Sequence, residues 1–345
     1  MIRTWCSFRL LPLTDKPLAV LALLKNFILA KLPHKKAVLR GVDIVTTYSC
    51  NLVCRHCNIQ TMEKEKCLQL TYEDYERIER ECSELGVFQY TFTGGEPLLR
   101  KDLDKLVAIF KPAKRIMIVQ TNGQPVKTLE KAQWLKRIGI DIVNVSLDSG
   151  LAEEHDANRG LKGHFEMTLK CLSLCKKAGL KIMAGTVLSH QNLHSRGIQE
   201  LIEYARKERL ILILNLAAPA GMWSHNKEIL LDEADQLYIR KLIRENPYLR
   251  MDMDSTINRY GCPAFKEKLY ITPYGDVTGC TFVQISVGNL KERSLEEIRN
   301  KGLELDLMKE FAPQCYCAEN KEFIEKYMSQ LGEDVPKHYT KVMEK

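Results

Sequence analysis

The sequence is notable first for what it lacks. Its 345 residues contain no uncharged apolar run of the ~18 residues that a membrane-spanning helix needs, and no repeat array or low-complexity tract. Apolar residues make up 45% and charged residues 28% of the chain, which excludes a disordered chain, a collagen-like repeat and a multi-span membrane protein. The length allows two domains or one large one, with an ample buried core.

Most of the chain also lacks an excess of either charge. The formal net charge is +7, but the first 42 residues hold eight Lys or Arg and a single acidic residue. The remainder is therefore balanced, so we expect no nucleic-acid partner. The excess belongs to an N-terminal extension, residues 1–40.

An apolar helix is expected within that extension. Residues 17–32 read PLAVLALLKNFILAKL, and Leu21, Leu24, Ile28 and Leu32 fall on one stripe. A basic, apolar helix of this kind binds anionic membrane surfaces. The alternative is a helix packed on the body of the protein with its lysines in water.

Twelve cysteines are more than core packing requires. A secreted disulfide scaffold is short and cysteine-dense, whereas this chain is long and has no convincing cleavable signal. Reduced cysteines in a cytoplasmic protein, several of them metal ligands, are the better interpretation.

A strand–helix unit recurs six times. The expected strands are 42–47, 87–93, 115–120, 141–147, 180–188 and 210–216, and the expected helices are 71–85, 101–110, 128–138, 164–178, 195–208 and 232–244. Such alternation predicts an α/β fold with a parallel sheet and right-handed crossovers. Six units close only part of a TIM-like barrel, whose chemistry lies just after its strands.

The alternation stops near residue 250. Residues 269–281 read LYITPYGDVTGCT, and the PYGD centre predicts a hairpin turn. We therefore expect a barrel over residues 41–250 and a small C-terminal cap over 251–345.

Three cysteines follow the first expected strand. Cys50, Cys54 and Cys57 have the spacing C-x3-C-x2-C within one loop. A structural zinc site needs four ligands, whereas a four-iron cluster held by three cysteines keeps one iron open for an exogenous ligand. Zinc or free thiols are the alternative interpretation.

A glycine-rich turn follows the second expected strand. Gly94 and Gly95 lack a Cβ, so their backbone approaches a ligand closely. Glu96 adds an acceptor, and Pro97 removes a donor and fixes the turn. GGEP alone is typical of a tight turn, but here it lies at the same end of the sheet as the cysteines.

Together these motifs resemble the radical S-adenosylmethionine (radical SAM) enzymes. The resemblance covers roughly residues 41–216 and rests on Cys50, Cys54, Cys57, Gly94-Gly95-Glu96-Pro97, Thr121-Asn122-Gly123, Ser146-Leu147-Asp148, His155-Asp156 and Arg159-Gly160. It implies a partial (β/α)6 barrel with a [4Fe-4S] cluster on the three cysteines. S-Adenosylmethionine then chelates the open iron.

The resemblance also implies the cofactor-binding residues and the reaction. By analogy these residues are Gly94, Gly95, Glu96, Pro97, Asn122, Ser146 and Arg159, with Arg159 pairing with the methionine carboxylate. An electron delivered to the cluster breaks the S–C5′ bond and gives a 5′-deoxyadenosyl radical that abstracts hydrogen from a substrate. The electron donor implied is a flavodoxin or ferredoxin.

A second group of cysteines lies in the tail. Cys262, Cys280, Cys315 and Cys317, with Gly275 five residues before Cys280, resemble the SPASM or shorter twitch extension that holds an auxiliary iron–sulfur cluster in part of the family. Four cysteines suffice for one [4Fe-4S] cluster, which fits twitch better than SPASM. The tight Cys315-x-Cys317 pair leaves the fourth ligand open, and stray thiols are the alternative.

The substrate is less well defined. Modification of a peptide or protein side chain is the first hypothesis, although no leader-peptide-binding domain is recognisable. The second is a small molecule or a membrane lipid such as an isoprenoid, with residues 1–40 making peripheral contact with the inner face of a membrane. A non-catalytic iron–sulfur protein is the third.

Overall fold

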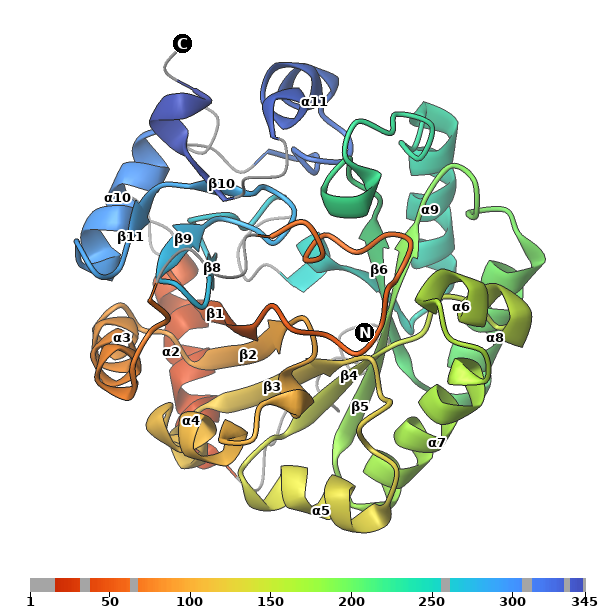
Figure 1. The fold of residues 1–345 in the computed structure, drawn as a ribbon, viewed down its shortest axis with the longest axis horizontal. Helices are drawn as coiled ribbons and strands as arrows, with labels where there is room; N and C mark the ends of the chain where they lie inside the picture. Colours follow the sequence, from red (N-terminus) through yellow and green to blue (C-terminus); the bar gives the residue numbers. More distant parts are fainter. Residues whose placement is uncertain are drawn as a thin grey trace.

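The computed structural model describes residues 16–31, 38–62, 68–255, 261–305, 312–331 and 336–343. Parts of the predicted N-terminal extension, including Leu32, therefore lie outside the described residues. The fold is a curved, mainly parallel sheet with helices on its outer side (Figure 1).

Seven parallel strands form the centre of the sheet in chain order: β1 (Gly41–Thr47), β2 (Gln89–Gly94), β3 (Ile116–Thr121), β4 (Ile142–Ser146), β5 (Lys181–Leu188), β6 (Ile211–Leu216) and β7 (Leu249–Met251). The helices between them are α3 (Tyr72–Glu84), α4 (Leu103–Ile109), α5 (Leu129–Arg137), α6 (Ala152–Arg159), α7 (His164–Lys177), α8 (Arg196–Glu208) and α9 (Glu233–Glu245). This confirms the predicted partial barrel and its six strand–helix units.

Local sequence explains where the helices begin and end. Thr71 and Asp74 form the expected capping box at the start of α3. Gly139 and Gly179 have φ of +97° and +76° after α5 and α7, a conformation that glycine adopts at little cost. The short, polar α6 and the three-residue β7 were not predicted, because neither shows an apolar period.

The C-terminal segment extends the same sheet. β8 (Lys268–Ile271) pairs in parallel with β1, and β9 (Asp276–Thr278) returns antiparallel to β8 and pairs with β11 (Gly288–Asn289). β10 (Ile285–Ser286) pairs separately with β12 (Lys337–His338), and α10 (Leu295–Glu304) and α11 (Lys321–Lys326) cover this end. The predicted hairpin is thus present, joined directly to the barrel, while the boundary at residue 250 stays a prediction.

Helix α2 (Pro17–Lys31) crosses behind the first strands (Figure 1). Ala19 is fully buried against Phe88, Ile116 and Ile142 at the amino ends of the strands. Lys16 Nζ lies 2.5 Å from Asp141 Oδ2, and Asn26 donates to the carbonyl of Gly86. The helix therefore covers the base of the barrel.

The opposite face of α2 is apolar and exposed. Leu18, Leu21, Leu24 and Ile28 are 52–62% exposed, so most of the stripe predicted from the sequence points away from the body. None of the helices in the described part of the chain is long and apolar enough to cross a membrane.

Candidate active site

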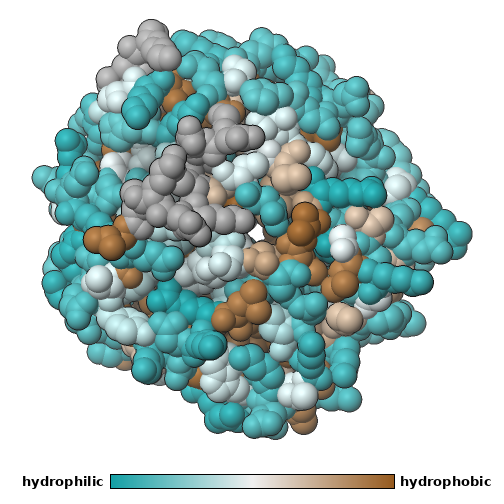
Figure 2. All heavy atoms as spheres, in the orientation of Figure 1, coloured by the Kyte–Doolittle hydropathy of each residue, from teal (hydrophilic) through white to brown (hydrophobic). Residues whose placement is uncertain are grey.

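A cavity of about 280 Å³ lies at the carboxyl ends of the barrel strands. Both groups of cysteines reach it: Cys50, Cys54 and Cys57 from one side, and Cys262, Cys280 and Cys315 from the C-terminal segment. Figure 2 shows the molecular face opposite α2, where hydrophilic residues dominate the rim and hydrophobic ones lie nearer the middle.

The glycines after β2 hold the cysteine loop in place. A Cβ on Gly94 would lie 2.2 Å from the carbonyl oxygen of Thr47, and a Cβ on Gly95 would lie 2.2 Å from that of Ser49. The close contact allows the amides of Gly95 and Glu96 to donate to these carbonyls at 2.8 and 2.9 Å. The space that a side chain on either glycine would need is thus occupied by the segment that leads into the cysteine loop.

Two further glycines press on the same loop. A Cβ on Gly160, at the end of α6, would lie 2.7 Å from the carbonyl of Val53. A Cβ on Gly221, after β6, would lie 2.3 Å from the carbonyl of Cys57, which accepts the amide of Met222 at 2.9 Å. The loop is therefore clamped by segments that follow three different strands, so its thiols keep fixed positions.

The number of thiols in the loop fits a cluster better than a structural zinc ion. A structural Zn²⁺ site is closed by four ligands, whereas the loop brings Cys50, Cys54 and Cys57 to the cavity. A four-iron cluster held by three cysteines keeps one iron open for an exogenous ligand.

The thiols are largely buried, but hydrogen-bond donors lie near their sulfur atoms. Burial raises the pKa of Cys50, Cys54 and Cys57. Asn122 Nδ2 lies 3.9 Å from Cys50 Sγ, and Arg159 Nη1 lies 3.7 Å from Cys54 Sγ. A bound cluster supplies the positive charge that keeps such buried thiols as thiolates.

Arg159 and Asp148 form a buried pair beside the cysteines. Arg159 Nη2 donates to Asp148 Oδ1 at 2.7 Å. Arg159 Nε and Asp148 Oδ2 are buried with no hydrogen-bond partner. Since buried polar atoms are normally paired, these two fit a site completed by a bound polar cofactor such as the methionine end of S-adenosylmethionine.

The other predicted cofactor residues divide into two sets. Gly94, Gly95, Asn122, Ser146 and Arg159 line the cavity, whereas Glu96 and Pro97 lie behind it. Glu96 is fully buried and accepts hydrogen bonds from the amides of Leu98 and Asn122 and from the Thr121 hydroxyl. Its side chain therefore ties the turn after β2 to the turn after β3, and it faces away from the cavity.

The four tail cysteines lie close together. Cys315 and Cys317 have their sulfurs 3.6 Å apart, and the Cys317 thiol also contacts Cys280. Burial raises the pKa of Cys262 to about 12, with Cys315 and Cys280 adding to the shift. Cys280 and Cys315 thus each interact with both Cys262 and Cys317.

One asparagine joins the two cysteine groups. Asn58 Nδ2, next to Cys57, donates to the carbonyl and hydroxyl oxygens of Thr281 at 2.9 and 2.7 Å, and Gln284 Nε2 donates to the Asn58 carbonyl. Thr281 follows Cys280. The two prospective cluster sites are thus held in register by side-chain contacts between the barrel and its C-terminal extension.

Sequence reasoning missed a charged part of the cavity wall. Asp43 of β1, Lys268 of β8 and Asp252 after β7 line it together. The available signal was a lone Asp in the apolar strand GVDIVTT, but only the β1–β8 pairing brings Lys268 beside it.

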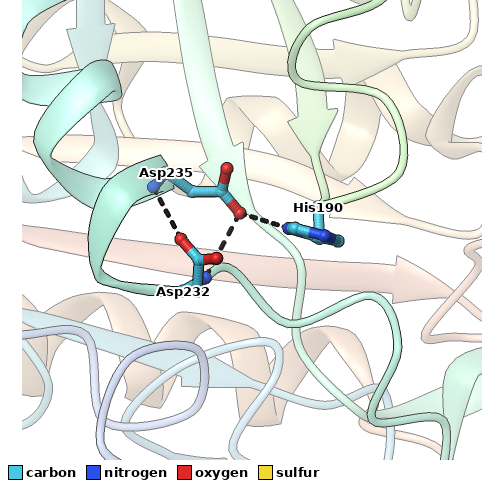
Figure 3. Close-up of side chains that lie close together, drawn as sticks. All are labelled: His190, Asp232 and Asp235. Atoms are coloured by element: carbon cyan, nitrogen blue, oxygen red, sulfur yellow. Dashed lines mark hydrogen bonds and ion pairs between the residues drawn. The ribbon is translucent and has the colours of Figure 1, made fainter.

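A compact group elsewhere reflects helix capping (Figure 3). Asp232 and Asp235 make the capping box that begins α9, and Asp235 Oδ2 also contacts His190 Nδ1 at 2.7 Å. Because the capped backbone amides already use both carboxylates, the group is explained by local structure.

Comparison with known proteins agrees with this geometry. The family model described as the radical SAM superfamily matches residues 44–205, and the SPASM model, described as an iron-sulfur cluster-binding domain, matches residues 262–319. The second match names SPASM where the cysteine count favours twitch.

Curated relatives align over part of the chain. Fe-coproporphyrin III synthase of Methanosarcina barkeri is 32% identical over 191 residues, which are 55% of this chain and 47% of that protein. A probable GTP 3′,8-cyclase of Methanocella arvoryzae is 28% identical over 215 residues, 60% of this chain and 69% of that protein. The chain thus spans about half the length of the first of these relatives.

Solved structures share the fold. Streptococcus suis SuiB bound to S-adenosylmethionine superposes with a TM-score of 0.61 at 19% identity, covering 81% of this chain and 74% of SuiB. The chain anSMEcpe with bound AdoMet and a peptide gives 0.57 at 17% identity, covering 79% and 82%.

Proposed function

Because the chain belongs to the radical SAM superfamily, we propose that it reductively cleaves S-adenosylmethionine and removes a hydrogen atom from a small molecule. The observation that carries the proposal is the clamped loop of Cys50, Cys54 and Cys57 beside a cavity lined by Arg159. When bound, the [4Fe-4S] cluster and S-adenosylmethionine supply one-electron chemistry that activates a C–H bond.

In this proposal, the chain's own residues bind the cluster and the cofactor and enclose the cavity. Cys50, Cys54 and Cys57 would hold the cluster, and Gly94 and Gly95 keep their loop in position. Arg159 offers a guanidinium to the methionine carboxylate while Asp148 fixes its orientation. The C-terminal extension adds its own residues to the cavity wall, which limits the access of water to a reactive site.

A small-molecule substrate is favoured over a peptide. The relatives in the comparison are named as a coproporphyrin synthase and a GTP cyclase, and the cavity wall carries polar side chains such as Asp43, Asn144 and Lys268. The peptide-bound neighbours share only the fold with this chain, so modification of a peptide or protein side chain stays a prediction. A flavodoxin or ferredoxin as electron donor is likewise proposed.

The test is anaerobic incubation of the reconstituted protein with dithionite and S-adenosylmethionine. We expect 5′-deoxyadenosine from the parent and none from Cys54→Ala. If the parent forms no 5′-deoxyadenosine, even with the aqueous metabolites of the source cells, the chain is a non-catalytic iron–sulfur protein and the proposal fails.

A peripheral membrane contact is proposed for α2. Its exposed face presents Leu21, Leu24 and Ile28, and Lys25 is exposed beside them. Lys16 and Arg40, counted in the basic excess, are instead engaged with Asp141 and Glu267. The residual positive charge of this segment still matches an anionic bilayer at the cytoplasmic face of a membrane.

Vesicle flotation tests the contact. We expect the full chain to float with anionic phosphatidylserine vesicles and the triple variant Leu21→Gln/Leu24→Gln/Ile28→Gln to remain in the dense fraction. Leu237→Gln, at a 65%-exposed position on α9, is the matched control and should float. Equal flotation of the triple variant and the parent would exclude α2 as the contact.

A further inference from the structure

Three charged side chains lie on the cavity wall beyond the cysteines. Lys268 Nζ is 3.0 Å from Asp43 Oδ2 and 3.5 Å from Asp252 Oδ1. Burial alone lowers the pKa of Lys268, but the two carboxylates raise it, so the ammonium is retained. Asp43 and Lys268 thus form an ion pair on this part of the cavity wall, with Asp252 beside them.

Asp43 is paired on one oxygen only. The side chain is 9% exposed, and its Oδ1 is buried without a hydrogen-bond partner. A buried carboxylate oxygen without a donor is costly. Because Asp43 lines the cavity, a molecule bound there is able to supply the missing donor.

A second acceptor lies on the same cavity wall, three strands along the sheet from β1. Asn144 Oδ1 of β4 is also buried without a partner, and Asn144 and Asn215 flank Gly185 of β5. A Cβ on Gly185 would lie 3.5 Å from Asn144 Oδ1 and 3.6 Å from Asn215 Nδ2. Asn215 Nδ2 donates to the carbonyl of Thr186 at 3.1 Å, so Asn144 Oδ1 is the acceptor that is left for a ligand.

Building on the proposed function, we propose that this wall is the substrate-recognition site and that the substrate is a hydrophilic small molecule whose hydroxyl or amino groups donate hydrogen bonds to Asp43 and Asn144. Both orphaned atoms are acceptors, so they select a ligand rich in donors. A hydrocarbon chain would leave both acceptors unpaired, and a fully ionised carboxylate or phosphate group has no hydrogen to donate to them. An isoprenoid substrate is therefore disfavoured at this wall.

Binding is tested on the iron-loaded protein with S-adenosylmethionine and without reductant, so that no turnover occurs. A two-phase extract of the source cells supplies three probes: small aqueous metabolites, aqueous peptides, and the lipid phase. Each is mixed with the protein, and the compounds retained on ultrafiltration are identified by mass spectrometry. We expect the protein to retain, from the fraction of small aqueous metabolites, a compound that carries hydroxyl or amino groups. Acetylation of the free amines in the extract distinguishes binding through amino groups from binding through hydroxyl groups.

Two variants test whether the retained compound binds at the cavity wall that carries Asp43 and Asn144. Asp43→Asn should lower it at least tenfold, and Gly185→Ala, whose added methyl makes only ordinary contacts, should lower it by filling space between the amides. Asp104→Asn on the outer helix α4 is the control and should retain the compound as the parent does. Iron content, measured for every variant, separates loss of binding from loss of folding.

Three results would overturn this assignment. In the first two, the protein retains compounds only from the lipid or peptide fraction, or from no fraction at all. In the third, Asp43→Asn and Gly185→Ala retain the compound as well as the parent does. Formation of 5′-deoxyadenosine by the parent is measured separately. If it occurs while the wall proves irrelevant, the proposed function stands and the recognition site is wrong; if it does not occur, the proposed function itself fails.

Discussion

At the scale of single residues, the site depends on polar groups that the fold keeps dry and oriented. His155 is a clear example. Its Nδ1 accepts the amide of Asp148 at 3.2 Å, so Nε2 carries the proton and donates to His164 Nδ1 at 2.9 Å. This neutral tautomer holds the segment from which Asp148 orients Arg159.

Protonation of His155 should therefore weaken the fold. Burial lowers its pKa from 6.5 to about 4, so between these values the unfolded chain binds more protons than the folded one, and stability falls as the pH falls. From pH 7 to pH 5 the loss from this residue is about 2 kcal/mol, at ~1.4 kcal/mol per pH unit below 6.5.

Urea unfolding at both pH values measures this. In His155→Asn the amide oxygen still accepts the Asp148 amide but does not titrate, so the loss between pH 7 and pH 5 should be smaller than in the parent by about that amount. If His155→Asn loses as much unfolding free energy between pH 7 and pH 5 as the parent does, His155 is not the titrating group.

At the scale of elements, loops from several strands hold one another through glycines. Gly95 should therefore be essential to the cluster site because its backbone packs directly against the cysteine loop. Gly95→Ala places a Cβ 2.2 Å from the Ser49 carbonyl and must displace the cysteine loop. We expect loss of about four irons per chain, one four-iron cluster, with the helical content preserved.

Gly41→Ala is the control for this change. Its Cβ would meet Gln89 at 3.7 Å or beyond, so iron binding should be unaffected. Full iron content in Gly95→Ala would show that the loop is not fixed by this contact.

The base of the barrel provides another prediction at this scale. Lys16 pairs with Asp141 and donates to the carbonyls of Arg115 and Gly139. Lys16→Met removes the Lys16 ammonium from the largely buried Asp141 carboxylate and should lower the free energy of unfolding by about 3 kcal/mol. Chemical denaturation measures this; a change below 1 kcal/mol would mean that α2 is not anchored through Lys16.

At the scale of the whole molecule, two cysteine sites share one cavity, joined through Asn58 and Thr281. The reconstituted parent should bind about eight irons per chain, as two four-iron clusters require. The quadruple variant Cys262→Ala/Cys280→Ala/Cys315→Ala/Cys317→Ala should bind about four. About four irons in both proteins would exclude an auxiliary cluster.

Much of this architecture was predictable, because apolar runs and helix periods are local signals. The six strand–helix units were predicted this way, and the loop of Cys50, Cys54 and Cys57 was predicted from the spacing of its cysteines. The pairing of β8 with β1 was not, since a four-residue strand far along the chain gives no sign of its partner. Lys268 was missed for that reason. Asn144 precedes Ser146 by two residues on β4 and therefore lies on the same face of the strand, a signal that the sequence did offer.

The central claim is that three thiolates leave one iron open to S-adenosylmethionine. Electron paramagnetic resonance of the dithionite-reduced quadruple tail variant, which retains only Cys50, Cys54 and Cys57 as cluster ligands, tests it directly. Addition of S-adenosylmethionine should change the spectrum of the remaining four-iron cluster. An identical spectrum with and without S-adenosylmethionine would contradict the account.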